Sequence, residues 1–565
     1  MNRWRIKKEG YETTEGYETD FDPHNRNKTG LLVFGLEREG SIPPEMVRVP
    51  TGEAFLYLPS LDRRETAVLN EYLIDRYEVT NREFKRFVTN GGYEKREYWK
   101  APFLKGGRPH SWEEAMAEFK DKTGRAGPAT WEAGDYPEGQ GDFPVAGISW
   151  YEAAAYADFV GKDLPTIYHW NRAAAPDSSP VIIPLSNFSF KGTAPVGSHQ
   201  GLSAHGAYDM AGNVREWCWN PSGDQRVILG GGWNDQAYMF DVAFTLPPFD
   251  RSPSNGMRCI KYLKTDENKA ELRKPVKFEK RDYEKERPVS NEVFEIYKSM
   301  YAYDKTKLNA KIEAVDDSPN EWTKEKISFD AAYGKERVIL YLYIPKNAEP
   351  PYQAVTYFPG GYAKLRSEFM ESMDLQSFDF IITTGRAVAY PIYEGTFERG
   401  GDADASLLPS TTNSYKDYVI KWAKDLRRSI DYLETRTDID ADRLAYYGVS
   451  WGGCMAAIMP AVETRFKASV ACVGGLYFQK ALPEVDTLNF APRVRIPTLM
   501  LNGRYDHWFP FETSQEPMFR LLGTPAAHKV QKIYETGHYV PRQILINETL
   551  DWLDRYLGPV KRKEQ

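Results

Sequence analysis

Strand-like and helix-like segments alternate along the chain from Asn291 onward. Short apolar runs, separated by longer and often amphipathic segments, read RVILYLYIP, QAVTYFP, RAVAYPIY, RLAYYGV, KASVACVGG, TLMLNG and KVQKIYE. Strands that alternate with helices form a mainly parallel sheet that is covered on both faces. Residues 291–560 are therefore expected to form a doubly wound α/β domain. The chain has 565 residues, which is too long for one hydrophobic core, so further domains are expected.

One of these runs leads directly into a serine that is flanked by glycines. Gly448-Val449-Ser450-Trp451-Gly452 fits G-x-S-x-G, and the small-residue segment GGCMAAIMPAV follows as a predicted helix. Glycines on both sides let the helix pack against the strand while the serine takes a strained backbone conformation. A purely structural serine is the alternative, but the placement of strand and helix favours a nucleophile. We therefore predict that Ser450 is a nucleophile.

A serine hydroxyl needs a base that is oriented by an acid. In this architecture the acid and then the histidine follow the serine along the chain. Asp506 comes after TLMLNG and His538 comes after KVQKIYE, so both lie past the carboxyl ends of their strands, as Ser450 does. His528 precedes its strand, and His507 adjoins Asp506 in sequence, so neither meets this positional requirement. Asp506 and His538 are the predicted acid and base.

Two backbone N–H groups are also needed to stabilise an oxyanion. Trp451, the residue after the nucleophile, is expected to supply the first. The second is expected from the loop after QAVTYFP, where Gly360 and Gly361 allow a close approach and Gly361 or Tyr362 would donate. A plain turn is the alternative at this Pro-Gly-Gly sequence, but its position after an apolar strand favours the functional role.

Taken together, these residues resemble the α/β-hydrolase family, in its dipeptidyl-peptidase and acetyl-esterase branch, over about residues 291–559. The resemblance implies a serine hydrolase that needs no cofactor. The segment has no propeller repeats and no long lid, so small acyl esters are the expected substrates. A serine peptidase that acts on short peptides would use the same three residues and is the alternative.

The N-terminal part differs in composition and has a resemblance of its own. Residues 46–264 are rich in Gly, Pro and Trp, and their clearest predicted helix is SWYEAAAYADFVGK, with Ser149 as N-cap. Five segments resemble the sulfatase-modifying factor family, the formylglycine-generating enzyme fold: YLIDRYEVTNREFKRFV, FPVAGISWYEAAAYADFVGKDLPT, GAYDMAGNVREWCWN, GGGW and NGMRC. The resemblance implies an α+β variant of the C-type lectin fold with little regular secondary structure.

Enzymes of that family use copper held by two cysteines, in a segment that corresponds here to Leu229–Asp241. The segment reads LGGGWNDQAYMFD and contains no cysteine, whereas copper(I) requires soft thiolate ligands. We therefore expect no copper and a catalytically silent domain that binds a ligand or shapes the entrance of the active site.

The same family binds calcium, and the resemblance places the ligands in YDMAGNVREW. They would be the side chains of Asp209 and Glu216 and the carbonyls of Gly212 and Val214, all hard oxygen ligands suited to calcium. The alternative, weighted equally, is that Asn213 and Glu216 only tie loops together through hydrogen bonds.

Two further segments complete the predicted organisation. Residues 1–45 are expected to form a short β-rich segment, with LLVFGLE as a strand. Residues 265–290 are about half charged and nearly free of aliphatic side chains, so we expect a linker that little could anchor.

Charge and targeting signals narrow the expected partners. The net charge of −7 without a strong basic block argues against nucleic acid. The chain has no signal-peptide pattern and no apolar run of about 18 residues, so we expect a cytoplasmic protein without a membrane partner. The oligomeric state is not indicated. Domains resembling these two occur downstream of bacterial serine/threonine kinases, so a non-catalytic sensor or binding module of a kinase-linked signalling system is a third hypothesis. The intact set of Ser450, Asp506 and His538 argues against it.

Overall fold

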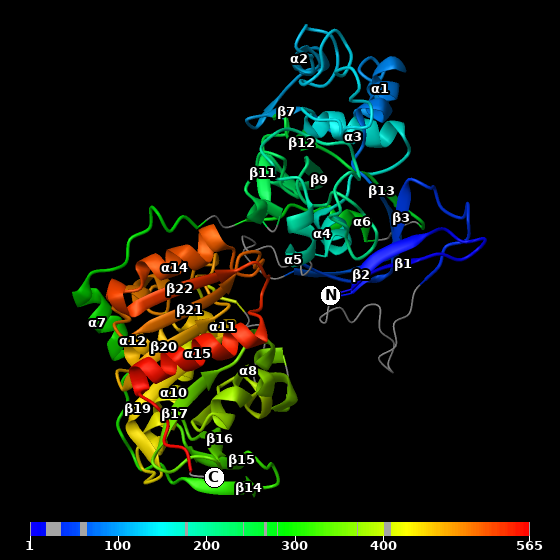
Figure 1. The fold of residues 1–565 in the computed structure, drawn as a ribbon. Coiled ribbons are helices and arrows are strands. Elements are labelled where there is room, and N and C mark those ends of the chain that lie inside the picture. Colours follow the sequence, from blue (N-terminus) through cyan, green and yellow to red (C-terminus); the bar gives the residue numbers. More distant parts are fainter. Residues whose placement is uncertain are drawn as a thin grey trace. The chain divides into compact units, whose positions relative to one another are not determined.

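The chain forms two compact units, residues 1–279 and 280–565 (Figure 1). The computed structural model describes residues 2–18, 35–56, 65–175, 179–240, 242–264, 268–278, 281–365, 367–369, 371–400 and 408–563. The boundary between the units lies inside the predicted linker. Among the described residues, none of the helices is both long enough and apolar enough to span a membrane.

A nine-stranded sheet forms the centre of the C-terminal unit, in the order β14-β15-β16-β18-β17-β19-β20-β21-β22. The pairs from β18 to β22 are parallel, and β14, β15, β16 and β18 pair antiparallel to one another. The strands are β14 (Lys311–Asp316), β15 (Trp322–Asp330), β16 (Arg337–Pro345), β17 (Tyr352–Phe358), β18 (Ala387–Ile392), β19 (Ile439–Val449), β20 (Phe466–Cys472), β21 (Thr498–Gly503) and β22 (Lys529–Tyr534).

Helices cover both faces of this sheet, as the predicted doubly wound α/β fold requires. Every residue of β17, β18 and β21 is buried, which occurs only when both faces of a strand are covered. The helices are α7 (Asn291–Ser299), α8 (Glu371–Thr383), α10 (Asn413–Leu433), α11 (Trp451–Met455), α12 (Met459–Val462), α13 (Thr487–Phe490), α14 (Glu516–Leu521) and α15 (Arg542–Leu557).

The strand order reverses beside β17. The chain passes from β17 outward to β18 and then returns to β19 on the other side of β17. Such a switch point opens a crevice at the carboxyl ends of the strands, where ligands bind in open α/β sheets. The loop after β17 and the turn after β19 therefore meet at this edge.

The N-terminal unit contains little regular structure, as the sequence predicted. Ser149 caps α3 in a capping box with Glu152. The strands are β1 (Asn2–Ile6), β2 (Thr14–Glu18), β3 (Met46–Val49), β4 (Gly52–Leu56), β5 (Glu65–Leu69), β6 (Tyr72–Asp75), β7 (Leu104–Lys105), β8 (Arg108–Pro109), β9 (Arg215–Ser222), β10 (Gln225–Leu229), β11 (Phe244–Leu246), β12 (Asn255–Gly256) and β13 (Ile260–Tyr262). The helices are α1 (Asn81–Thr89), α2 (Trp112–Glu118), α3 (Trp150–Phe159), α4 (Ile167–Ala174), α5 (Ser179–Ile182) and α6 (Lys269–Leu272).

The expected strand LLVFGLE lies largely outside the described residues. The expectation that little anchors residues 265–290 is wrong, because charged side chains of this segment form ion pairs with both units. Lys269 and Arg273 both pair with Asp163 in the first unit, and Arg281 pairs with Asp486 in the second at 2.9 Å.

Candidate active site

Ser450 occupies a strained turn between β19 and α11. Its backbone has φ 56° and ψ −107°, a conformation that side chains other than glycine rarely adopt. A side chain at Gly448 would begin 2.2 Å from the carbonyl oxygen of Gly452, and one at Gly452 would begin 2.1 Å from that of Phe358. The predicted strain and the need for small neighbours are both confirmed.

The structure brings together the three side chains that the sequence proposed as a triad. The Nε2 atom of His538 lies 2.8 Å from Oγ of Ser450, and its Nδ1 lies 2.8 Å from Oδ2 of Asp506. The other carboxylate oxygen of Asp506 accepts hydrogen bonds from the backbone N–H groups of Trp508 and Phe509, at 2.9 and 3.1 Å. Asp506 is fully buried and fixed, whereas the His538 side chain is 22% exposed. With Nδ1–H donating to Asp506, Nε2 is free to accept the serine proton.

The other two histidines of this unit lie where they cannot replace His538 at Ser450. His528 precedes β22, is exposed, and contacts the Tyr556 hydroxyl through Nδ1 at 3.1 Å. His507 is buried beside His538, with ring centroids 6.5 Å apart. The rings of Trp508 and Phe509 also lie about 6 Å from the His538 ring. The packing of aromatic rings around His538 was not predicted, although Trp508 and Phe509 closely follow Asp506 in the sequence.

The predicted oxyanion donors stand at the first positions of two helical turns. Trp451 begins α11, and Gly361 begins a 3₁₀ turn over Gly361–Leu365, so their N–H groups have no partner within the turn. A side chain at Gly360 would begin 3.7 Å from Cβ of Ser450, which shows how closely this loop approaches the serine. The carbonyl of Pro359 accepts from the N–H of Gly452 at 3.0 Å and ties the loop to α11.

A buried carboxylate that the sequence did not reveal supports this loop. Asp374 in α8 is 2% exposed and accepts hydrogen bonds from the hydroxyls of Tyr357 in β17 and Tyr390 in β18, at 2.8 and 2.6 Å. The hydroxyl of Tyr362, in the predicted oxyanion loop, also lies near it. Burial raises the pKa of Asp374, and these hydroxyl groups oppose the rise. The carboxylate links the two strands that flank the predicted oxyanion loop.

In the N-terminal unit, the residues predicted to bind calcium are engaged with protein groups. Glu216 is fully buried and accepts from Nε of Arg258 at 2.8 Å and from the indole N–H of Trp170 at 2.7 Å. Asp209 accepts from the N–H of Gly197 at 2.6 Å. In the part of the chain that the structure describes, no group of three or more His, Cys, Asp or Glu residues is arranged to hold a metal ion.

Asp209, Gly212, Val214 and Glu216 therefore do not fit the calcium site that the resemblance implied. The reason is Arg258, in the segment NGMRC, which neutralises the carboxylate that calcium would need. The hydrogen-bonded alternative fits better, because Asn213 and the Val214 N–H both donate to Glu78, at 2.7 and 3.0 Å.

Burial dominates the electrostatics of this acid cluster. It raises the pKa of Glu78 well above its usual value and the pKa of Asp209 to about 6. Burial also raises the pKa of Glu216, while the Arg258 guanidinium opposes that rise.

The segment that corresponds to the copper site holds an ion pair in its described part. Arg215 pairs with Asp235 at 2.5 Å. Cys218 and Cys259 are buried elsewhere in the unit, and burial raises the pKa of both thiols well above its usual value. A raised pKa disfavours the thiolate form that copper(I) binds.

Comparison with solved structures finds proteins similar to about half of the chain. An acetyl xylan esterase from Paenibacillus sp. R4 is 18% identical, with a TM-score of 0.38, over 49% of this chain and 98% of its own. The acylaminoacyl peptidase of Pyrococcus horikoshii is 15% identical, with a TM-score of 0.33, over 44% of each chain.

Comparison with curated proteins finds relatives of modest identity. Hercynine oxygenase of Mycolicibacterium smegmatis is 29% identical over 208 residues, which are 29% of this chain and 46% of that protein. Serine/threonine-protein kinase Pkn1 of Chlamydia trachomatis is 28% identical over 263 residues, 40% of each chain. The formylglycine-generating enzyme of Thermomonospora curvata is 32% identical over 189 residues, 27% of this chain and 61% of that protein. The chain thus spans less than half of the length of the first two.

A family model also matches this chain directly. Residues 36–180 and 183–263 match the sulfatase-modifying factor enzyme 1-like domain. All of these residues lie in the first compact unit. The N-terminal unit therefore contains a sulfatase-modifying factor enzyme 1-like domain.

Proposed function

We propose that the C-terminal unit is a serine hydrolase that cleaves small acyl esters. Ser450 is the nucleophile, His538 the general base and acid, and Asp506 the residue that orients the imidazole. One observation carries the proposal: a continuous chain of contacts from Asp506 through His538 to Ser450, with 2.8 Å at each step. Nucleophile, base and orienting acid are thereby in mutual hydrogen-bond reach.

The reaction follows from this geometry. As Oγ of Ser450 attacks the ester carbonyl, Nε2 of His538 takes the hydroxyl proton, and Asp506 stabilises the imidazolium that forms. The carbonyl oxygen becomes an oxyanion, for which the N–H groups of Trp451 and of Gly361 or Tyr362 are the proposed donors. His538 returns the proton to the departing alcohol. A water molecule, activated in the same way, then releases the acid from the serine.

Access to the histidine supports a small substrate. His538 keeps 22% of its side chain exposed, although Asp506 beside it is fully buried. The connection from β20 to β21, residues 473–497, contains only α13 and one 3₁₀ turn, so no lid of the usual kind is inserted there. A peptidase that acts on short peptides would use the same machinery, so the assay must include both bond types.

A serine-directed fluorophosphonate with peptide mapping tests the catalytic role. The label should attach to the peptide that contains Ser450, disappear in Ser450→Ala, and persist in Ser299→Ala, which changes an exposed serine in α7. Absence of labelling in the wild type would favour the non-catalytic sensor hypothesis. Faster turnover of a peptidyl nitroanilide than of nitrophenyl acetate would replace the esterase proposal with the peptidase alternative.

For the N-terminal unit we propose a binding role without copper chemistry. Leu229–Asp241 contains no cysteine, so the thiolate pair is missing. Incubation of the protein with copper and a C-x-P-x-R peptide should leave the peptide cysteine unchanged. Formylglycine detected by mass spectrometry would contradict this proposal.

A further inference from the structure

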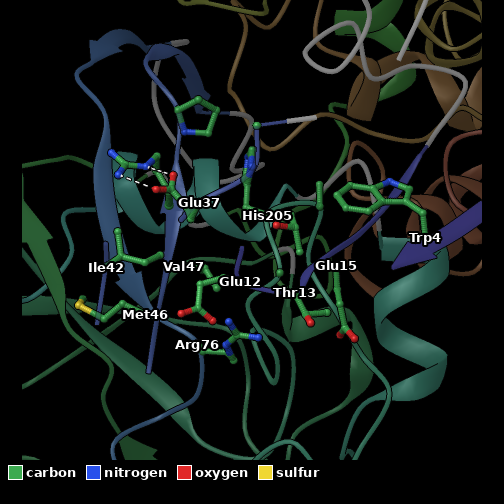
Figure 2. Close-up of a pocket in the computed structure, with 16 residues that line it drawn as sticks. Trp4, Glu12, Thr13, Glu15, Glu37, Ile42, Met46, Val47, Arg76 and His205 are labelled. Atoms are coloured by element: carbon green, nitrogen blue, oxygen red, sulfur yellow. Dashed lines mark hydrogen bonds and ion pairs between the residues drawn. The ribbon is translucent and has the colours of Figure 1, made fainter. Parts of the chain in front are cut away.

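A cavity of about 170 Å³ lies in the N-terminal unit, and none of the residues that line it belongs to the predicted calcium or copper segments (Figure 2). It forms where the hairpin of β1 and β2 meets residues 35–50 and the loop around His205. Ile42, Met46 and Val47 supply apolar lining and are themselves at least nine-tenths buried. Since space of about 10–15 Å³ on this measure already holds one water molecule, the cavity has room for a small ligand.

Two of the three glutamates that line the cavity are already neutralised. Glu15 pairs with Arg5 and accepts a hydrogen bond from the Tyr208 hydroxyl at 2.6 Å. Glu37 pairs with Arg48, which also lines the cavity. These groups are satisfied within the protein and do not call for a ligand.

Arg76 differs from them, because its guanidinium forms no ion pair with any described residue. Its backbone is fixed, since its N–H donates to the carbonyl of Glu45 at 2.7 Å and its carbonyl accepts from Tyr208 at 2.8 Å. The Nε atom is buried without a hydrogen-bond partner, and no atom of the guanidinium forms an ion pair within the described residues. A guanidinium carries five N–H donors in a planar fork that matches a planar anion such as a carboxylate.

Glu12 is the matching acid in the same cavity. Its carboxylate accepts one hydrogen bond, from the N–H of Gly40 at 3.2 Å, and has no cationic partner among the described residues. Figure 2 shows the side chains of Glu12 and Arg76 directed toward the same part of the cavity. One positive and one negative group are thus left, so a ligand with a single charge would leave the other group unpaired.

We propose that this cavity binds a small zwitterion of amino-acid size. Its carboxylate meets the guanidinium of Arg76, its ammonium meets the carboxylate of Glu12, and its side chain lies against Ile42, Met46 and Val47. The proposal gives a ligand class to the binding role suggested for this unit. It does not depend on the hydrolase reaction, which uses residues of the other unit.

Calorimetric titration of the full chain with four probes tests the proposal. L-Alanine should bind, whereas N-acetyl-L-alanine, which lacks the ammonium, and L-alaninamide, which lacks the carboxylate, should each bind at least 10-fold more weakly. Acetate should also be weak. No measurable L-alanine binding, or acetate binding as strong as that of L-alanine, would overturn the proposal.

Variants assign the two contacts. Arg76→Gln should weaken L-alanine binding at least 10-fold, and Arg76→Lys should lose less. Glu12→Gln should remove the preference for L-alanine over N-acetyl-L-alanine. Arg38→Gln, at an exposed arginine outside the cavity lining, should bind as the wild type does. Unchanged binding in both Arg76→Gln and Glu12→Gln would refute the site. Hydrolysis of nitrophenyl acetate, measured in parallel, reports separately on the proposed function of the other unit. The melting temperature of each variant, compared with that of the wild type, reports on its folding.

Discussion

Each unit of the molecule contains a hydrogen-bonded cluster of titratable side chains. The two clusters differ in whether their hydrogen bonds lead to a partly exposed group or stay buried. In the C-terminal unit, the hydrogen bonds run from a buried Asp506 to a partly exposed His538 and stop at a serine hydroxyl. In the N-terminal unit, the cluster of Glu78, Asp209, Glu216 and Arg258 is at most 1% exposed, and each carboxylate is bonded to protein donors. An open end permits chemistry, whereas a closed network holds loops in place. Loss of a group should therefore abolish activity in the first cluster and stability in the second.

The largest effect is expected on the activity that we propose for the open cluster, Ser450, His538 and Asp506. Ser450→Ala and His538→Ala should each lower kcat on nitrophenyl acetate by several orders of magnitude, on the scale of ~10⁶ for triads that act as a unit. The double variant should be hardly worse than either single one, because both remove the same step. Melting temperatures should stay close to that of the wild type. Asp506→Asn should cost somewhat less than either.

Substitutions of the other two histidines of this unit serve as controls for this prediction. His528→Ala should keep full activity, because His528 contacts Tyr556 and not Ser450. His507→Ala should keep most activity. Loss of turnover in His507→Ala together with its survival in His538→Ala would contradict the triad.

Loss of the cation from the closed cluster, Glu78, Asp209, Glu216 and Arg258, should instead lower the stability of the protein. Arg258→Met leaves the Glu216 carboxylate buried without its cation, and breaking such a pair costs about 3–5 kcal/mol of unfolding free energy. Urea denaturation followed by tryptophan fluorescence would measure the loss. The double variant Arg258→Met, Glu216→Leu should recover part of it, because no unpaired charge is left. Equal destabilisation in the single and double variants would show that the charge is not the cause.

The same contrast explains which features of the two clusters could be predicted from the sequence. The arrangement of these three side chains was predictable, because chain order and strand ends place Ser450, Asp506 and His538 on one edge of a parallel sheet. The strand β14 was not, because its residues KIEAVD are almost all exposed at the edge of the sheet and lack an apolar run. The partner of Glu216 was also missed. Arg258 lies 42 residues away, and only tertiary packing brings its guanidinium to the carboxylate.

The pH dependence of stability is the next smaller effect, and Asp209 is the residue that tests it. Burial raises the pKa of this carboxyl in the folded state to about 6, above its ordinary value of 3.8. The folded state then holds the proton more tightly than the unfolded one, so stability should fall as pH rises from about 4 to about 6 and level off above that. The loss would amount to about 1–3 kcal/mol.

Asp209→Asn should remove much of this fall, because an amide does not ionise. Its backbone φ of 55° suits asparagine, and the amide oxygen can still accept from Gly197. Urea titrations at pH 4 and pH 7.5 should therefore show a gain in stability for the variant at pH 7.5 and little change at pH 4. A variant with the same pH dependence as the wild type would assign the fall to Glu78 instead, whose pKa is raised as well.

The smallest effect is expected from calcium. A site with a dissociation constant of about 10⁻⁴ M would add about 1.4 kcal/mol of stability at about 1 mM calcium. Here Arg258 and Trp170 already bind the Glu216 carboxylate, so calcium would have to displace a buried ion pair. Calcium and EDTA should therefore shift the melting temperature no more than magnesium does. A rise in melting temperature with calcium alone would mean that Arg258 releases the Glu216 carboxylate. The closed cluster could then bind a ligand, as the open cluster is proposed to do.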